Sequence, residues 1–414
     1  MNQSRSRRGS FGRDSVRGNF RNNFHKSRPS NVSGGGNGQE RRKFGNKIKY
    51  MDARLIVKKE AELIKSEPYQ AKYGFSDFNI AEKIKQNILT KGYKTPTPIQ
   101  DQTINHVLEG KDVVGIANTG TGKTAAFLIP LINKVYIDRG QKVLIVAPTR
   151  ELAVQIRNEF NDFTLNAGLE SVLCIGGVNI NPQIRALKQP FNFVIGTPGR
   201  IKDLKNQNKL NIASFSTIVL DEVDRMLDMG FIHDIKFIIS HLPKYRQSLF
   251  FSATMTPAVT EIMHSLSPDP VTVSVKKQET SLNVDQDVVN VRGANKLEVL
   301  HDLLISDGFE KVLIFGRTKW GVEKLSRALT QRGFRVAALH GNKNQNQRQR
   351  ALEDFRNNKI NILLATDVAA RGLDIDGITH VINYELPETY DDYVHRIGRT
   401  GRAERKGTAL TLID

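Results

Sequence analysis

Residues 112–124 read Asp112-Val-Val-Gly-Ile-Ala-Asn-Thr-Gly-Thr-Gly-Lys-Thr124. An apolar, strand-like run at 112–116 leads into a glycine-rich loop, and an apolar, helix-like run at 125–135 follows. In this order, the glycines let backbone N–H groups and the helix N-terminus face a phosphate group. The amine of Lys123 can then reach the β and γ phosphates, and the hydroxyl of Thr124 can bind Mg²⁺. The stretch predicts a nucleotide site made of Ala117 (where the general pattern has glycine), Asn118, Thr119, Gly120, Thr121, Gly122, Lys123 and Thr124.

Strand-like and helix-like segments alternate along the rest of the chain. Downstream of the loop, the buried-strand candidates are 142–147, 171–175, 191–195, 217–220, 248–251 and 271–275. After a polar segment, the same alternation restarts with 311–315, 336–339, 361–365, 380–383 and 408–412. This rhythm is typical of βαβ units and a parallel sheet. We therefore expect two tandem parallel-sheet α/β domains, at residues 75–275 and 288–414, joined by a linker at 276–287.

The apolar segment at 217–220 ends in Asp221-Glu222-Val223-Asp224. Its carboxylates follow a predicted strand, at the end where parallel α/β folds form their ligand sites. We expect Asp221 to hold Mg²⁺ through its water shell and Glu222 to position and polarise the attacking water. Read alone, the four residues are also compatible with a solvated acidic turn, and the phosphate loop favours the catalytic interpretation. Val223 alternates with its acidic neighbours and is expected to face the core.

Composition limits the class of protein. The chain has 414 residues, 39% hydrophobic and 25% charged, which is long enough for two domains of ordinary size. Its formal net charge of +18 favours nucleic acid first and an acidic membrane surface second, because Lys and Arg that neutralise phosphates release counterions. The single cysteine, Cys174, excludes an intrachain disulfide and suits a reducing, cytoplasmic location. The apolar runs are far shorter than the roughly 20 residues that span a bilayer, so no membrane partner is expected.

Residues 1–50 carry thirteen Lys and Arg side chains against two carboxylates. Their Ser, Asn, Gly and spaced Phe residues cannot bury enough apolar surface to offset the entropy of ordering, which predicts a disordered tail. Such a tail can hold RNA loosely, through guanidinium groups on phosphates and Phe or Arg faces against bases. A solubilising extension and a transit peptide are the alternatives, and the lack of an amphipathic pattern argues against the second. Residues 51–74 are predicted to form a charged, partly helical linker.

Further short motifs occur on both sides of the phosphate loop. In chain order they are Gly92-Tyr-Lys-Thr-Pro-Thr-Pro-Ile-Gln100, Pro148-Thr-Arg-Glu-Leu-Ala153, Gly176-Gly177, Thr197-Pro-Gly-Arg200, Ser252-Ala-Thr254, Gln345 with Arg348, Ala365-Thr-Asp-Val-Ala-Ala-Arg-Gly-Leu-Asp374 and His395-Arg-Ile-Gly-Arg-Thr-Gly-Arg402. Taken singly, each is compatible with an ordinary turn. Together and in this order, they resemble the motifs of the DEAD-box RNA helicases of superfamily 2, over residues 75–414. The resemblance implies two tandem RecA-like domains, with Asp-Glu-Val-Asp in place of the usual tetrapeptide.

For the nucleotide, the resemblance implies ATP with Mg²⁺ as cofactors. Gln100 is expected to pair with the adenine edge. Phe75 is expected to stack on the adenine ring, and Phe78 is a competing candidate for that role. Thr124 and Asp221 remain the expected magnesium residues.

The second domain is implied to complete the active site. Arg399 and Arg402 match the family's arginine fingers, which place positive charge on the γ-phosphate and are typically worth about 10³–10⁵ in rate. His395 is expected to orient the site, and Asp374 to contact the nucleotide. Because these residues lie apart from the phosphate loop in the chain, the resemblance implies that hydrolysis requires the two domains to close.

For RNA, the resemblance implies contacts to phosphates and sugars from both domains, and therefore little sequence preference. The candidates are Arg150, Gly177, Thr197 and Arg200 in the first domain, and Gln345, Arg348 and Thr366 in the second. Asp224, Ser252 and Thr254 are implied to couple the catalytic carboxylates to domain closure.

The implied function is an ATP-dependent RNA helicase that unwinds short duplexes locally or remodels RNA–protein complexes. Its ATP hydrolysis is expected to be stimulated by RNA. An ATP-gated RNA clamp with slow turnover and a DNA helicase of the same superfamily are the alternatives. We expect a monomer, with ribonucleoproteins as further partners. Val223 stands where the family usually has Ala, and we expect it to tune the activity without abolishing it.

Overall fold

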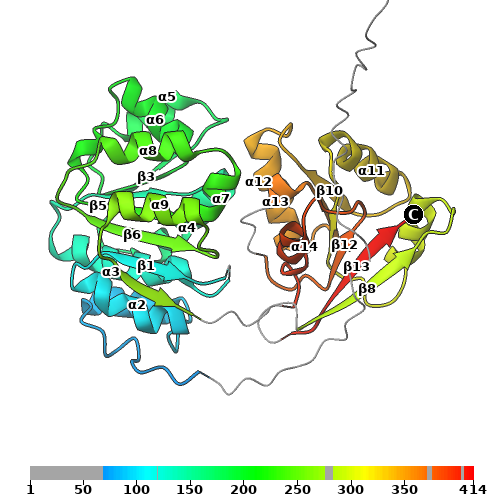
Figure 1. The fold of residues 1–414 in the computed structure, drawn as a ribbon, viewed down its shortest axis with the longest axis horizontal. Coiled ribbons are helices and arrows are strands. Elements are labelled where there is room, and N and C mark those ends of the chain that lie inside the picture. The colour runs from blue at the N-terminus through cyan, green and yellow to red at the C-terminus, as the bar shows by residue number, and fades with distance from the viewer. Residues whose placement is uncertain (1–68, 119, 276–282, 371–374, 402–404) are drawn as a thin grey trace, which may run out of the picture. The chain divides into compact units, whose positions relative to one another are not determined.

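A computed structural model of the chain describes residues 69–118, 120–275, 283–370, 375–401 and 405–414 (Figure 1). The predicted tail at 1–50, most of the predicted linker at 51–74, and the site candidates Thr119, Asp374 and Arg402 lie outside the described residues. Predictions about those residues therefore stay predictions. Among the helices of the described ranges, none is long and apolar enough to cross a membrane.

The first domain is built on a parallel sheet of seven strands in the order β3-β4-β2-β5-β6-β1-β7. All the strands predicted for this domain are confirmed, with ends that move by no more than two residues. Their bounds are β1 (Val113–Ile116), β2 (Val143–Val146), β3 (Ser171–Cys174), β4 (Phe193–Gly196), β5 (Thr217–Asp221), β6 (Gln247–Ser252) and β7 (Val271–Ser274).

Helices cover both faces of this sheet, because successive residues of a strand point to opposite sides. In β2, for example, Val143 and Ile145 join one apolar cluster, and Leu144 and Val146 join the other. The first face packs against α1 (Glu82–Thr90), α2 (Pro98–Leu108), α3 (Lys123–Ile137) and α4 (Arg150–Phe163). The second packs against α5 (Ile180–Ala186), α6 (Pro198–Asn206), the 3₁₀ turn η2 (Ile212–Ser214), α7 (Val223–Asp228), α8 (Ile232–Ser240) and α9 (Pro257–Leu266).

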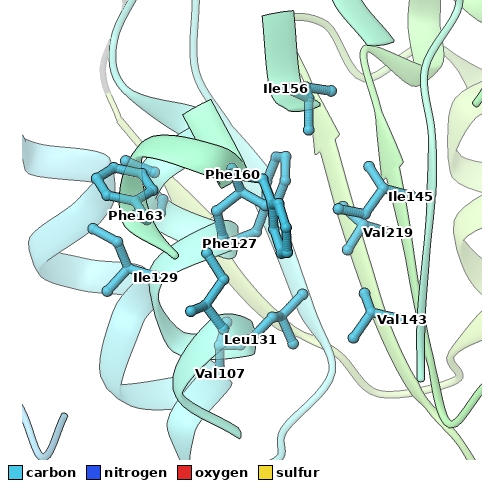
Figure 2. Close-up of a cluster of buried hydrophobic side chains, with 14 of the residues drawn as sticks. Val107, Phe127, Ile129, Leu131, Val143, Ile145, Ile156, Phe160, Phe163 and Val219 are labelled. Carbon is cyan, nitrogen blue, oxygen red and sulfur yellow. The ribbon is translucent and has the colours of Figure 1, made fainter. Parts of the chain in front are cut away.

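Figure 2 shows the centre of the first cluster. Phe127 of α3 and Phe160 of α4 meet Ile145 and Val219 of the sheet there. All four side chains are buried, with 0–1% of their surface exposed. Full burial stabilises a domain by about 1.5–3 kcal/mol per large apolar side chain. This packing holds α3, and the phosphate loop before it, in a fixed position.

The second domain has a parallel sheet of six strands in the order β10-β11-β9-β12-β13-β8. The strands are β8 (Val284–Asn290), β9 (Val312–Phe315), β10 (Val336–Leu339), β11 (Ile362–Ala365), β12 (His380–Asn383) and β13 (Gly407–Ile413). The helices are α10 (Lys296–Leu304), α11 (Lys319–Gln331), α12 (Gln345–Arg356), α13 (Asp367–Ala370) and α14 (Tyr390–Ile397). The strands predicted from 311 onward are confirmed.

The predicted linker at 276–287 is wrong at its end, because β8 begins at Val284. This strand pairs in parallel with β13 alone and forms an edge of the sheet. An edge strand has to bury only alternate residues, so Val284 and Gln286 are buried while Asp285 between them and Asp287 after them are partly exposed. The buried Gln286 accepts a hydrogen bond from the hydroxyl of Tyr393 (3.0 Å). A strand with two aspartates and an inward glutamine carries almost no apolar pattern, which explains the error.

Candidate functional site

Three neighbouring strands of the first domain lead to predicted site residues at their carboxyl ends. The order β5-β6-β1 places the end of β6 between the other two. Ser252 ends β6 beside Ile116 of β1, and Asp221 ends β5 beside Phe251. The backbone N–H of Ala117 donates to the carbonyl of Ser252 (3.1 Å), which joins the phosphate loop to β6. The sheet therefore brings the phosphate loop, the acidic run and the Ser-Ala-Thr motif to one edge, as the sequence predicts.

The phosphate loop connects β1 to α3. Gly122 has a φ of +92°, a left-handed conformation that favours glycine, and α3 begins at the next residue. The ammonium group of Lys123 is buried and donates across the loop to the carbonyl of Ala117 (2.8 Å). The hydroxyl of Thr121 donates to the carbonyl of Asn118 (2.8 Å). The N-terminal N–H groups of α3 follow this turn directly, which is the arrangement that binds phosphate groups.

Gln100 connects the predicted adenine motif to the phosphate loop. It is the third residue of α2 and forms a capping box with Thr97, whose backbone N–H donates to the Gln100 Oε1 (2.9 Å). Its Nε2 donates to the carbonyl of Gly122 (3.1 Å). Both ends of the amide are thus engaged within the protein, so an adenine contact has to share these atoms or displace one bond.

The two aromatic candidates for adenine stacking are both buried. Phe75 is 3% exposed and Phe78 is 1% exposed. Their rings pack edge to face with centroids 6.1 Å apart, and Phe75 makes a similar contact with Tyr93 at 5.9 Å. Neither ring offers an open face in this structure, so the choice of Phe75 over Phe78 stays a prediction.

Asp221 lies at the buried end of β5 and is 2% exposed. Burial raises the pKa of its carboxyl to about 7, although the ammonium group of Lys123 acts in the opposite direction. Its Oδ1 is buried and has no hydrogen-bond partner within the described part of the chain. A buried acceptor costs free energy until a ligand satisfies it, and carboxylate oxygens are ligands that Mg²⁺ prefers. With the hydroxyl of Thr124 in the first turn of α3, Asp221 fits the predicted magnesium site.

Glu222 follows β5 in a left-handed conformation, with a φ of +54°, which is uncommon for a residue other than glycine. Its Oε2 accepts a hydrogen bond from the guanidinium of Arg225 at 2.8 Å, and the two side chains are only 5% and 6% exposed. Strained backbone held by its surroundings is typical of active sites. Arg225 was not among the residues predicted from the sequence. Its spacing of three from Glu222 at the start of a helix is the signal that identifies such a pair.

Val223 and Asp224 begin α7 and face different surroundings. Val223 is fully buried in the apolar cluster on the second face of the sheet, as its position predicts. One carboxylate oxygen of Asp224, Oδ2, accepts hydrogen bonds from the backbone N–H groups of Ala253 and Thr254, both at 3.1 Å. The hydroxyl of Ser252 donates to the carbonyl of Thr254 (2.8 Å). The predicted coupling residues therefore form one hydrogen-bonded unit.

The other half of the same sheet edge carries the predicted RNA contacts of the first domain. β3, β4 and β2 are neighbours, and their carboxyl ends lead to Gly177, Thr197 and Arg150, respectively. Arg150 packs over the glycine turn so closely that a Cβ on Gly177 would lie 1.8 Å from its Nη1. Arg200 donates to the carbonyl of Val178 in the same turn (3.2 Å), and its buried Nη1 has no partner in the described ranges. Two guanidinium groups at one turn form a site suited to phosphate.

The predicted RNA contacts of the second domain also follow neighbouring strands. β10, β11 and β9 lie side by side. Gln345 begins α12 after β10, and Arg348 lies one turn later in the same helix. Thr366 follows β11, and its backbone N–H donates to the carbonyl of Leu339 in β10 (3.3 Å). These residues again gather at the carboxyl edge of a parallel sheet.

The described part of the last motif lies on and just after α14. Arg399 is 5% exposed, and its Nε donates to the carbonyl of His395 one turn earlier (3.3 Å). His395 and Arg399 line a pocket together with Asp367 and Phe315. The expected approach of Arg399 to Lys123 stays a prediction, because the two residues belong to different domains.

Comparison with known proteins agrees with this arrangement. Residues 97–262 match the family described as DEAD/DEAH box helicase, and residues 295–404 match the helicase conserved C-terminal domain. The chain is 44% identical over 341 residues to the ATP-dependent RNA helicase CshA of Limosilactobacillus reuteri, covering 82% of this chain and 69% of that protein. The chain belongs to the DEAD/DEAH box helicase family. It is also 45% identical to the CshA of Listeria monocytogenes over 341 residues, covering 82% of this chain and 66% of that protein.

Solved structures of DEAD-box proteins have the same fold. Saccharomyces cerevisiae Dbp5 bound to RNA and ADP BeF3 is similar with a TM-score of 0.72 and 29% identity, over 82% of this chain and 89% of that chain. This likeness confirms the predicted class of two RecA-like, parallel-sheet α/β domains. The chain spans about two thirds of the length of its curated relatives, with a coverage of 69% and 66% for the two CshA proteins.

Within the DEAD-box motifs of the second domain, the structure adds Arg396, which was not singled out from the sequence. Its guanidinium binds both carboxylate oxygens of Asp367, at 2.6 and 2.8 Å, and lies 5.0 Å from the ring centroid of Phe315. It also donates to Oδ1 of Asn383 (3.1 Å) and is only 2% exposed. Arg396 therefore ties the motif after β11 to the motif on α14. The sequence signal that could have identified Arg396 is its position inside the His395–Arg402 motif, as an arginine in addition to Arg399 and Arg402.

Proposed function

We propose that this chain is an ATP-dependent RNA helicase whose first domain hydrolyses ATP and whose two domains together hold RNA. The observation that carries the proposal is the arrangement at the carboxyl edge of the first sheet. There, the ammonium group of Lys123 acts on the buried carboxyl of Asp221, and Asp224 accepts hydrogen bonds from the motif after β6. The relatives named ATP-dependent RNA helicase, and the Dbp5 structure with RNA and ADP BeF3, support the same function.

In this proposal, Lys123 and the N-terminus of α3 bind the β and γ phosphates, and Gln100 selects adenine. Thr124 and Asp221 would hold Mg²⁺, which supplies positive charge to the phosphates during transfer. Glu222 orients the attacking water, and Arg225 keeps its carboxylate in one direction. Since Val223 lies in the core and leaves the three carboxylates in place, it tunes this chemistry without preventing it.

Arg399 and Arg402 complete the active site from the second domain, where Asp374 contacts the nucleotide and His395 orients the fingers. The positive charge of these arginines acts where the transferring phosphoryl group is most negative. Hydrolysis therefore depends on domain closure. RNA residues on both domains align only in the closed state, so ATP and RNA each strengthen the binding of the other by linkage.

The closed protein holds a bent single strand, which excludes the partner strand of a short duplex, and hydrolysis reopens the domains. Unwinding is then local and non-processive. The contacts go to phosphates and sugars, so RNA of many sequences is a substrate. We also propose that the chain acts as a monomer in the cytoplasm, on RNA alone and on ribonucleoproteins.

A strand-release assay tests the proposal. A short RNA duplex with one labelled strand is incubated with the protein and with ATP, with ADP or without nucleotide. We expect release with ATP only, and no release by Lys123→Ala, because that variant lacks the phosphate-binding amine. A lifetime assay on single-stranded RNA separates a helicase from a static clamp. Long-lived RNA complexes without ATP-dependent release would contradict the helicase function.

The basic tail is proposed to hold RNA loosely beside the two domains. Deleting residues 1–50 removes thirteen cations, so RNA affinity should fall and its dependence on salt should weaken. An unchanged salt slope would show that the tail contacts few phosphates and would contradict this role.

A further inference from the structure

Trp320 is an exposed aromatic side chain to which neither the motifs nor the proposed mechanism gives a role. It is the single tryptophan of the chain, and 79% of its surface is exposed. It lies in the first turn of α11, where the hydroxyl of Thr318 accepts a hydrogen bond from the backbone N–H of Gly321 (2.9 Å). This cap fixes the start of the helix, so Trp320 projects from ordered backbone. Exposure of a large indole needs a reason, because burying its apolar surface would stabilise the protein more than leaving it in water.

The position of α11 relates Trp320 to the predicted RNA contacts. α11 follows β9, α12 follows β10, and Thr366 follows β11, which lies between these two strands. Lys319, at the start of α11, packs against the segment between β10 and α12. A Cβ placed on Gly341 of that segment would lie 3.2 Å from the Lys319 Cε. Trp320 is therefore on the same carboxyl edge of the second sheet as the residues expected to hold RNA.

The surface around Trp320 is predominantly cationic. Lys324 lies one helical turn after it, on the same side of α11. A carboxylate of the same helix, Glu323, accepts bonds from Lys343 and His340, both at 2.9 Å, and lies 3.6 Å from Arg327. A second carboxylate, Glu385, accepts the backbone N–H of Arg317. The patch that we define here consists of Trp320 with the cations Arg317, Lys319, Lys324, Arg327 and Lys343, against the carboxylates Glu323 and Glu385.

A flat aromatic group among cations is the combination that single-stranded RNA recognises. The cations attract phosphates, and the indole offers a face on which a base stacks whatever its identity. A docked protein segment needs apolar neighbours for the indole, whereas residues 317–319 beside it are exposed and polar. Charge therefore favours RNA as the occupant.

We propose that Trp320 stacks on a base of the bound RNA strand at the edge of the second domain, while Lys319 and Lys324 contact the neighbouring phosphates. The proposal rests on the proposed RNA-binding function and extends it, because the predicted motifs contact phosphates and sugars only. The stacked base adds affinity and limits sliding of the strand along the domain, without adding sequence preference.

The single tryptophan makes the test direct. The wild-type protein is titrated with a short, end-labelled single-stranded RNA and a non-hydrolysable ATP analogue, and two signals are followed in the same sample. The anisotropy of the label reports binding, and the indole fluorescence reports stacking on Trp320. We expect quenching of the indole that follows the anisotropy curve and protection of the indole from acrylamide. Saturated anisotropy with an unchanged indole signal would overturn the proposal and favour a protein as the occupant of this patch.

Variants supply an independent readout. Trp320→Ala should weaken RNA binding about tenfold and leave its salt dependence unchanged, because stacking releases no counterions. Trp320→Phe should restore most of the affinity. The matched control is Tyr245→Ala, since Tyr245 is 90% exposed between two cationic residues but precedes β6, at the opposite edge of the first sheet. Equal affinities for Trp320→Ala and wild type would overturn the proposal, and wild type that binds no RNA would overturn the proposed function as well.

Discussion

One carboxylate oxygen of Asp224 accepts hydrogen bonds from both the backbone N–H and the hydroxyl of Thr254, at 3.1 and 3.2 Å. Asp224 lies two residues after Glu222, which orients the attacking water in the proposed mechanism. The end of β6 and the catalytic end of β5 are thus held together by one charged group. A change at one of them is transmitted to the other through these bonds.

Asp224→Asn should uncouple ATP hydrolysis from strand release. The amide cannot accept three donors at one atom as the carboxylate does, and hydrogen bonds to a charged group contribute about 1.5–3 kcal/mol each. We expect strand release to fall by about tenfold or more, while the KM for ATP changes little because the side-chain bonds of Asp224 go to residues 225, 253 and 254. Parallel ATPase and strand-release assays check this. Equal losses in both assays, with a raised KM, would contradict a coupling role.

Arg225→Met should lower kcat for ATP hydrolysis more than it changes the KM. The variant leaves the buried carboxylate of Glu222 without its 2.8 Å partner, so its direction is no longer fixed. Loss of one member of a buried pair also lowers the free energy of unfolding by about 3–5 kcal/mol. Steady-state kinetics at a temperature where the variant is folded separates the two effects. The control is Arg225→Lys, which keeps the charge and should recover part of kcat.

Gly122→Ala should weaken ATP binding through Gln100. An added Cβ would lie 2.4 Å from the Gln100 Nε2, and the φ of +92° disfavours any side chain. The matched control is Gly110→Ala, where φ is +78° and nothing lies within 4 Å of the new Cβ. Both variants should lose about 1 kcal/mol of stability from backbone strain. Only Gly122→Ala should lose ATP affinity, and equal affinities for the two variants would remove Gln100 from the nucleotide site.

Glu323→Gln should lower stability in a pH-dependent way. Hydrogen bonds from His340, and next from Lys343, lower the pKa of the Glu323 carboxyl to about 2. A folded-state pKa below the unfolded value gives stability that is fully present above about pH 4.5 and is lost as the pH falls toward 2. Wild type should therefore exceed the variant by about 2 kcal/mol at pH 7, after allowance for solvent screening. Urea unfolding at several pH values checks that this gap narrows below pH 4.5.

The strands and the nucleotide loop could be predicted from the sequence because their signals are local. Buried parallel strands such as β2 are continuous apolar runs. The glycines Gly120 and Gly122 before Lys123 are needed because the backbone there has a positive φ. β8 was not predicted because an edge strand pairs with only one neighbouring strand and tolerates aspartates at its partly exposed positions. Its place was set by pairing with β13, more than a hundred residues away in the sequence.

The catalytic acids could also be predicted, whereas the bonds that neighbouring arginines make were not predicted. Asp221 and Glu222 follow an apolar strand, so their position at a sheet edge is implied by the chain itself. The bonds of Arg225 to Glu222 and of Arg396 to Asp367 depend on side-chain directions that arise only after packing. The bond between Gln100 and the backbone of Thr97 is local, but the bond of Gln100 to Gly122 joins two segments that only the fold brings together.

If RNA controls ATP hydrolysis at the Lys123 and Asp221 site, the hydrolysis rate must respond to RNA. The rate of ATP hydrolysis is recorded while single-stranded RNA is added, in parallel with single-stranded DNA of the same sequence. We expect the rate to rise several-fold to a plateau with RNA, to change little with DNA, and to stay at background in Lys123→Ala. Equal rates with and without RNA would show that RNA does not control hydrolysis at this site.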